Sequence, residues 1–313
     1  MSTGLVPLFT RGIDEHKDLV LKTYKSAVDR IFHMGSMDGR YLDRVLWEGY
    51  GLPQNHMSLQ PVAQGEFKPS WSKRYTVNNY ALGDFISYYD WEDDQYGVIA
   101  KLLPKKGGAL AKSHATLKER VVADWFKNVA FAAAGNSTQG MSDGRPLFDT
   151  AHPVSASNTG VTYANRPSTD VDLSISTYQA AANNLRQQFA ANDVTIIDNS
   201  PRLLVVNPDQ GYLAKQILRG EWERGTGDRN KNFITEDNVQ LLEWAYFRTS
   251  GSTGTRNAWM LFGQEHELYF FDRQDVKTMM DWVINVLAYE FVSFSRFTWG
   301  ADDWRGSYGS KGQ

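Results

Sequence analysis

The chain has 313 residues, of which 42% are apolar and 22% charged, and its formal net charge is −3. This length and balance are typical of one large folded domain or of two domains in close contact. The absence of cysteine excludes disulfides, thiolate metal sites and cysteine nucleophiles. The net charge argues against a protein that binds nucleic acid over its whole surface. No signal peptide or membrane-spanning run is found, so we expect a soluble protein made in the cytoplasm.

Residues 1–57 have the character of an extended arm rather than of a domain. The spacing of apolar residues predicts a helix over residues 14–33, with Asp14 as its N-cap. The segment from Tyr41 to Trp47 is a short apolar patch that has no partner nearby in the sequence. We therefore expect it to dock on the main body of the chain or on another subunit.

Residues 58–90 begin with a turn-rich segment and continue into two aromatic and β-branched runs, Lys73–Val77 and Tyr80–Tyr89. Such runs are typical of strands, and the simplest interpretation is a long two-stranded ribbon. An isolated ribbon is only marginally stable in water. It needs a surface, either on a neighbouring molecule or on its own domain. We expect the acidic residues 90–94 that follow to form a solvated turn.

The stretch from Ala109 to Ala134 predicts the longest helix. Its apolar residues recur at spacings of three, four and seven, and Gly107-Gly108 and Gly135 flank it as breakers. A helix of this size spans about 39 Å. It is either a spine that supports a sheet or an ordinary core helix.

The remaining chain predicts a mixed α+β body. Helices are expected over residues 176–191 and 208–218. Strands are expected over residues 202–206, 239–247, 259–262 and 268–271, with one long strand over residues 282–297. No internal repeat is found, and the arm and the ribbon extend from this body.

Catalytic signals are few. Asp149 and His152 are the one acid and histidine pair beside a turn, and they resemble half of a hydrolytic dyad. No nucleophile elbow, phosphate-binding loop or dinucleotide fingerprint accompanies them, and no two histidines stand at metal-ligand spacing. A structural role for His152 is the simpler interpretation. We therefore predict no catalytic residue, no metal site and no cofactor.

Two motifs resemble the major capsid proteins of tailed bacteriophages, with the head subunit of the Mu type as the nearest likeness. They are WEDDQYG at residues 91–97 and DGRPLFDTAHP at residues 143–153, and they lie on either side of the long helix. The sequence DWRG at residues 303–306 matches the end of that family, and the likeness extends over roughly residues 70–310.

The resemblance implies the capsid fold typed on phage Hong Kong ninety-seven. In that fold, residues 1–57 would be the N-terminal arm and residues 58–90 the extended loop. Residues 91–194 and 281–313 would form the peripheral domain, with the spine helix at 109–134, and residues 195–280 the axial domain. The chain reaches the arm soon after Met1, so we expect any scaffolding to be a separate protein.

The resemblance also implies a structural role in the virion. Copies would join as pentamers and hexamers into an icosahedral-type head around double-stranded DNA, without sequence-specific binding or a membrane. A portal, and separate scaffolding or decoration proteins, would be further partners. Candidate subunit contacts are Tyr41, Trp47, Glu66, Phe67, Lys68, Trp71, Lys73, Arg74 and Arg305. Two alternatives stay open: an encapsulin-like compartment, and a hydrolase or glycan-binding module that uses Asp149 and His152.

Overall fold

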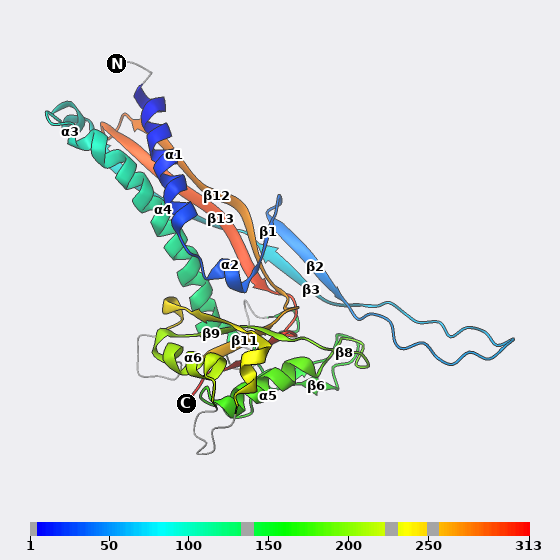
Figure 1. Ribbon diagram of the computed structural model, residues 1–313. Helices are drawn as coiled ribbons and strands as arrows, with labels where there is room; N and C mark the ends of the chain where they lie inside the picture. The colour runs from blue at the N-terminus through cyan, green and yellow to red at the C-terminus, as the bar shows by residue number, and fades with distance from the viewer. Residues whose placement is uncertain (1–4, 133–140, 223–230, 249–256) are drawn as a thin grey trace.

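The computed structural model describes residues 5–132, 141–222, 231–248 and 257–313. Figure 1 shows an elongated body in which two long helices lie on a sheet, a second body around another sheet, and a ribbon that projects far from both. No helix of the described ranges combines the length and the apolar character that are needed to cross a membrane. The fold is α+β, as the sequence predicts.

The spine of the elongated body is α4 (Val98–Trp125), which continues as a short π-helix, η1 (Phe126–Ala130). It begins eleven residues before the predicted start at Ala109, and Ala133 and Ala134 lie outside the described residues. The predicted breakers Gly107 and Gly108 lie inside the helix. A Cβ at Gly107 would stand 2.5 Å from Ile13 Cγ2, because α1 crosses there in close contact. These glycines therefore serve helix packing, not helix termination.

The N-terminal arm forms two helices, α1 (Leu5–Thr23) and α2 (Val28–Ile31), in place of the single predicted helix. Asp14 lies inside α1 and accepts a hydrogen bond from Thr278 Oγ1 at 2.7 Å, so its prediction as an N-cap is wrong. Residues between the helices are held by Glu119 of α4, which accepts the Ala27 N–H at 2.7 Å. Helix α1 thus packs on its own subunit, along α4 (Figure 1).

The acidic segment before α4 is more ordered than a solvated turn. Residues 88–92 form the short helix α3 (Tyr88–Glu92). Asp94 then accepts the backbone N–H groups of Val98 and Ile99, both at 2.8 Å. It satisfies two of the unpaired donors at the start of α4, which is why the spine begins there.

A four-stranded sheet covers one side of the spine in the order β1 (His33–Ser36), β12 (Leu268–Val283), β13 (Ala288–Ala301) and β4 (Asn78–Ser87). Only β1 and β12 run parallel. The predicted strand over residues 282–297 is wrong at its start, because Trp282 and Val283 end β12 and residues 284–287 form the turn. That turn holds neither glycine nor proline, so the sequence shows no break there.

The projecting ribbon pairs β2 (Tyr41–Trp47) with β3 (Pro69–Thr76) in antiparallel register. The predicted pairing of residues 73–77 with residues 80–89 is therefore wrong. Strands β3 and β4 are separated by Val77 alone, and one residue cannot reverse the chain as a hairpin requires. Strand β4 enters the spine sheet instead, and the partner of β3 comes from the predicted arm.

The second body is built on a sheet in the order β10 (Gln240–Glu243), β9 (Pro201–Val206), β11 (Trp259–Gly263) and β14 (Ser307–Ser310). Leu204 and Val206 pack toward α5 (Ile175–Arg186) and α6 (Gly211–Arg219). Leu203 and Val205 pack toward the end of α4. Both faces of β9 are buried, which explains its continuous apolar run.

Short elements complete the described chain. They are β5 (His152–Pro153), β6 (Thr162–Tyr163), β7 (Gln188–Phe189), β8 (Ile196–Ile197), η2 (Pro208–Gln210), η3 (Phe233–Asp237) and η4 (Ala245–Phe247). The predicted helices at 176–191 and 208–218 correspond to α5 and to η2 with α6, although α5 ends at Arg186. The predicted strand at 239–247 is shorter, since η4 replaces its second half.

Candidate functional site

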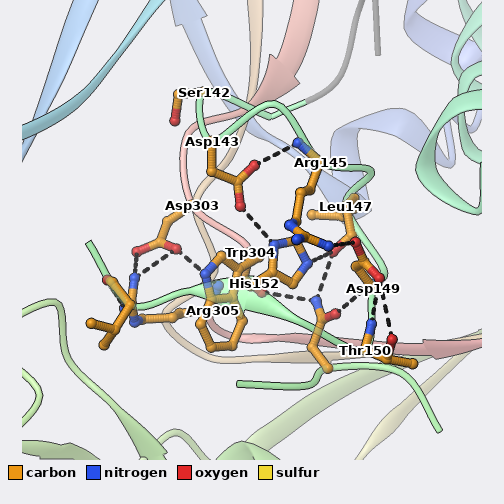
Figure 2. A network of polar contacts seen from close by, with 12 residues as sticks. Ser142, Asp143, Arg145, Leu147, Asp149, Thr150, His152, Asp303, Trp304 and Arg305 are labelled. Carbon is orange, nitrogen blue, oxygen red and sulfur yellow. Dashed lines mark hydrogen bonds and ion pairs between the residues drawn. The ribbon is translucent and has the colours of Figure 1, made fainter. Parts of the chain in front are cut away.

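The DGRPLFDTAHP motif folds around its own histidine. Asp143 accepts a hydrogen bond from His152 Nδ1 at 2.7 Å through one carboxylate oxygen and the Arg145 N–H at 2.9 Å through the other. The imidazole stacks on the Trp304 indole with the ring centroids 5.0 Å apart and the planes 10° from parallel. The His152 side chain is fully buried, and the Asp143 side chain almost so. The pair holds the loop against the C-terminal motif (Figure 2).

Asp149 is engaged elsewhere. Its carboxylate pairs with Arg145 Nη1 at 2.9 Å, and no described hydrogen bond joins it to His152. Burial opposes ionisation of Asp149, but the hydrogen bonds from Arg145 and from the Thr150 N–H, together with the neighbouring charges, outweigh burial and lower the pKa of the carboxyl. Because His152 is enclosed and bound to Asp143, the arrangement lacks an accessible base. The geometry therefore gives no support to the alternative of a hydrolase or glycan-binding module that uses Asp149 and His152.

Arg305 of the DWRG motif is the second centre of this cluster. Its guanidinium donates to Asp303 at 3.0 and 2.8 Å, and to the carbonyl oxygens of Phe189 and Val154 at 2.6 Å each. The next residue, Gly306, has φ +73°, and a Cβ there would stand 2.4 Å from the Glu265 carbonyl oxygen. Only glycine lets the chain turn this tightly behind the arginine.

Asn165 connects the two motifs. Its amide nitrogen donates to the carbonyl oxygens of Leu147 at 2.7 Å and Trp304 at 3.3 Å, and its side-chain oxygen accepts the Asp149 N–H at 2.9 Å. We call this cluster the polar joint, comprising Asp143, Arg145, Asp149, His152, Asn165, Asp303, Trp304 and Arg305. The joint connects segments about 150 residues apart in sequence, and Asn165 could not be predicted as part of it because no local pattern marks this residue.

A second polar cluster fixes the root of the ribbon. Arg44 Nε binds Asp302 Oδ2 at 2.6 Å, and the Tyr75 hydroxyl donates to Asp302 Oδ1. Lys73 Nζ donates to the Ala301 carbonyl oxygen at 3.0 Å, and the Arg44 guanidinium lies 3.8 Å from the centre of the Tyr269 ring. Burial raises the pKa of Asp302 and lowers that of Lys73 to about 8. These contacts, which we call the ribbon root, set the direction in which the ribbon leaves the body.

Beyond the root, residues 48–68 form the extended loop between β2 and β3. The rings of Trp47 and Phe67 stack with their centroids 4.9 Å apart, and both side chains are half-exposed. Further along, Leu59 is fully exposed and Val62 is 68% exposed. The loop touches its own subunit near its start, where Ser157 Oγ donates to Glu48 Oε2 at 2.6 Å. Its apolar side chains have no core of their own.

Neither cluster is arranged for metal chemistry. Within the described residues, no group of three or more His, Asp or Glu side chains is placed to hold an ion. The polar joint has the geometry of a structural lock, with its charges neutralised inside the chain.

Comparison with known proteins decides the family. Residues 72–309 match a family model described as phage capsid protein. The chain belongs to this family. The match includes the end of the ribbon, the spine helix and the polar joint, and it identifies the protein as a structural component of the virion capsid, not an enzyme.

Solved structures agree on the fold. The capsid structure of cyanophage P-SCSP1u is 13% identical and has a TM-score of 0.56, with 94% of this chain and 93% of that chain covered. A chain from Microbacterium phage Oxtober96 is 10% identical with a TM-score of 0.54, covering 93% and 92%. The mature capsid of bacteriophage PhiM1 is 12% identical with a TM-score of 0.52, covering 92% and 87%. No curated protein matches the chain.

The predicted contact residues of this capsid protein fall into two groups, according to where they lie in the structure. Tyr41, Trp47, Glu66, Phe67, Lys68, Trp71 and Arg74 lie on the ribbon and are exposed or partly exposed. Glu66 and Lys68 pair at 2.6 Å, and Arg74 pairs with Asp43 at 2.7 Å. Lys73 and Arg305 instead direct their cationic groups into their own subunit. Subunit contact stays a prediction for the ribbon residues, whereas Lys73 and Arg305 stabilise the fold.

Proposed function

We propose that this capsid protein joins with copies of itself as hexamers and pentamers, which close an icosahedral-type head around double-stranded DNA. In this proposal, the extended loop of each subunit lies on a neighbour and buries its apolar side chains there. A capsid protein acts through self-association, so the stability of the shell depends on such burial across large interfaces.

The extended loop carries the proposal. Its exposed apolar residues include Tyr50, Leu52, Met57, Leu59, Val62 and Phe67, and the loop connects the strands of a ribbon that has only two. Such a ribbon is marginal in water. An exposed apolar segment of this length marks a surface that binds another chain. The ribbon root holds the loop away from its own body, which leaves a second subunit as the fitting partner.

The sheets support a division into domains that differs from the predicted one. We infer that α1, α4 and the sheet of β1, β12, β13 and β4 form the peripheral domain, and that the sheet of β10, β9, β11 and β14 with α5 and α6 forms the axial domain. In this division β12 belongs to the peripheral domain, because it pairs along β13, although most of it lies in the predicted axial range of 195–280. Strand β14 joins the axial domain, since it pairs with β11. A portal and separate scaffolding or decoration proteins remain proposed partners.

The deletion of the loop tip tests the proposal. Residues 52–66 are replaced by a short Gly-Ser turn, which keeps β2 and β3 joined. We expect a folded subunit with an unchanged unfolding midpoint, and electron microscopy should show free capsomers or open sheets where the wild type forms closed shells.

A replacement in another exposed segment serves as the control. It exchanges Thr159 and Gly160, two exposed residues between β5 and β6, for Gly-Ser. Shells should form normally there. Closed shells from the loop deletion would contradict the assigned role, and the nucleic acid content of wild-type shells distinguishes a phage head from an encapsulin-like compartment.

A further inference from the structure

The solvent-facing side of α4 carries a row of lysines. Lys101, Lys105 and Lys112 are exposed, and their spacings of four and seven place them on one side of the helix. We call these three residues the lysine stripe. At 1.5 Å per residue, the stripe extends about 16 Å along the spine.

The charges of the stripe are not neutralised within the described part of the chain. No described hydrogen bond or ion pair involves these three side chains. Other lysines of the same helix differ: Lys106 binds Asp84 at 2.6 Å, and Lys118 binds Asp272 at 2.7 Å. These two lysines, which reach toward the sheet, have acidic partners, whereas the described structure pairs none of the stripe residues.

Acidic residues of α4 are turned away from the stripe. Glu119 is buried and accepts hydrogen bonds from the Ala27 N–H and from Trp244 Nε1, both at 2.7 Å. Asp124 pairs with Lys127 at 2.8 Å near the end of the helix. Helix α1 runs alongside with charges of both signs (Figure 1). Within the described chain, the surface of α4 itself therefore carries an unpaired positive row between Lys101 and Lys112, on a protein whose net charge is −3.

The opposite face of the spine sheet has a different charge pattern. Thr278 contacts α1, so the alternate residues Lys277 and Asp281 of β12 lie on the face that the helices leave open. Asp281 stands opposite Glu290 on β13, and Arg296 lies on the same face of that strand. Charges of both signs are mixed there. The two sides of the subunit therefore differ: α1 on the helix side also carries charges of both signs, but α4 presents a row of three lysines that the described structure leaves unpaired, and the open face of the sheet has no such row on β12 or β13.

We propose that the lysine stripe binds the phosphate backbone of the packaged double-stranded DNA, with the α4 side of the subunit facing the interior of the shell. The inference rests on the proposed function, because it requires a shell that encloses DNA. Ammonium groups contact phosphates as point charges without reading the base sequence. About 16 Å of duplex holds about five base pairs at 3.4 Å each, so the three lysines meet phosphates within half a helical turn.

The contacts are few in each subunit and repeated over the shell. Three lysines release about three counterions, which makes the binding weak and strongly dependent on salt. Because the lysine contacts are repeated in every subunit, the inner wall as a whole binds the DNA surface, while each single contact forms and breaks freely. A duplex can therefore slide along the wall during filling.

The test measures binding of the full-length, unassembled subunit to a random-sequence duplex of 30 base pairs by fluorescence anisotropy, over a series of salt concentrations. The triple variant Lys101→Gln, Lys105→Gln and Lys112→Gln is compared with the wild type. We expect the slope of log affinity against log salt to fall in magnitude by about 2.7, since each phosphate contact contributes about 0.9. Between 50 and 200 mM salt, this corresponds to about a 40-fold smaller change in affinity.

The control removes the same charge elsewhere, with Lys215→Gln, Lys231→Gln and Lys277→Gln, which are also exposed and lie outside the ribbon. Its salt slope should stay near that of the wild type. Equal slopes for the two triple variants would overturn the proposal, because net charge alone would then explain the binding. So would a wild-type subunit that does not bind the duplex at low salt.

Assembly of the same variants separates this inference from the proposed function. The stripe variant should close shells like the wild type, and its circular dichroism should be unchanged, because glutamine has a helix propensity similar to that of lysine. Loss of shells in the stripe variant alone, with unchanged DNA binding, would show that the stripe contacts a neighbouring subunit and would overturn the inference. Failure of the wild type to form shells would instead refute the proposed function and leave the duplex measurement unaffected.

Discussion

The polar joint and the extended loop differ in where their side chains find partners. In the joint, polar groups are buried and paired inside one chain, as Arg305 is with Asp303 and two carbonyl oxygens. In the loop, apolar groups such as Leu59 and Val62 are exposed, and the described part of their own subunit leaves them uncovered. The joint therefore has polar groups in its interior, whereas the loop has apolar groups on its surface.

The difference separates folding from assembly. Burying a charged group is favourable only when its hydrogen bonds are satisfied, so the residues of the joint are specified one by one. The loop needs only apolar side chains of suitable size on a surface that a second chain covers. Two of the motifs that carry the family resemblance belong to the joint, and they stabilise the subunit, whereas contact with other copies is left to less distinctive residues.

The largest effect on folding is expected at Arg305. Arg305→Ala leaves the Asp303 carboxylate without its partner and removes the hydrogen bonds to two carbonyl oxygens. We expect the free energy of unfolding to fall by about 3–5 kcal/mol, as measured by urea denaturation. Arg74→Ala, which breaks an ion pair on the exposed ribbon, should leave the urea midpoint unchanged. Similar midpoints for both variants would contradict the distinction between joint and ribbon.

A smaller, pH-dependent effect is expected at the ribbon root. The pKa of Lys73 is about 8 in the folded protein because the side chain is buried, against about 10.4 in an unfolded chain. Between these values the unfolded state binds more protons, so the free energy of unfolding rises with pH. The gain is at most about 1.4 kcal/mol per pH unit.

Lys73→Met isolates this contribution. The difference in unfolding free energy between the wild type and the variant should increase in favour of the wild type from pH 8 to pH 10 and be flat below pH 7. Lys277→Met on the exposed face of β12 is the control, and its pH slope should match that of the wild type. A parallel pH dependence for Lys73→Met would show that the burial of this lysine has no influence on stability.

The smallest effect on folding is expected in the extended loop. Leu59→Ser with Val62→Ser should change the free energy of unfolding by less than about 0.5 kcal/mol, because both side chains are exposed. The buried substitution Leu204→Ala should cost about 2–5 kcal/mol in the same assay. The loop variant should nevertheless yield fewer closed shells by electron microscopy. An unfolding midpoint that falls with shell yield would place the loop among the folding elements.

Much of the local structure was predictable from the sequence. The apolar periodicity between Leu110 and Trp125 identified the spine, and β9, α5 and α6 lie close to their expected positions. The family resemblance is confirmed. Errors occurred where contacts between distant residues decide the structure. Gly107 was predicted to precede the spine helix, but it lies inside the helix, where α1 packs closely against it. The turn after Val283 was predicted as strand, because it holds neither glycine nor proline.

The candidate site was only partly predictable. The His152 side chain is enclosed by its own subunit, and its acidic partner is Asp143, not Asp149. Arg305 was predicted at a subunit contact and lies inside the fold instead. Asn165 was missed, because a lone asparagine in a polar loop carries no signal until its hydrogen-bond partners are brought around it.

By itself, the sequence determined which segments are helical or extended, which of their faces are apolar, and which family the chain resembles. Those properties follow from spacings of a few residues along the backbone. Only the tertiary structure decided that β2 pairs with β3, that β4 joins the spine sheet, and that the two motifs meet at the polar joint. Strand pairing and buried hydrogen bonds depend on side chains far apart in the chain, so their free energies are invisible to any local pattern.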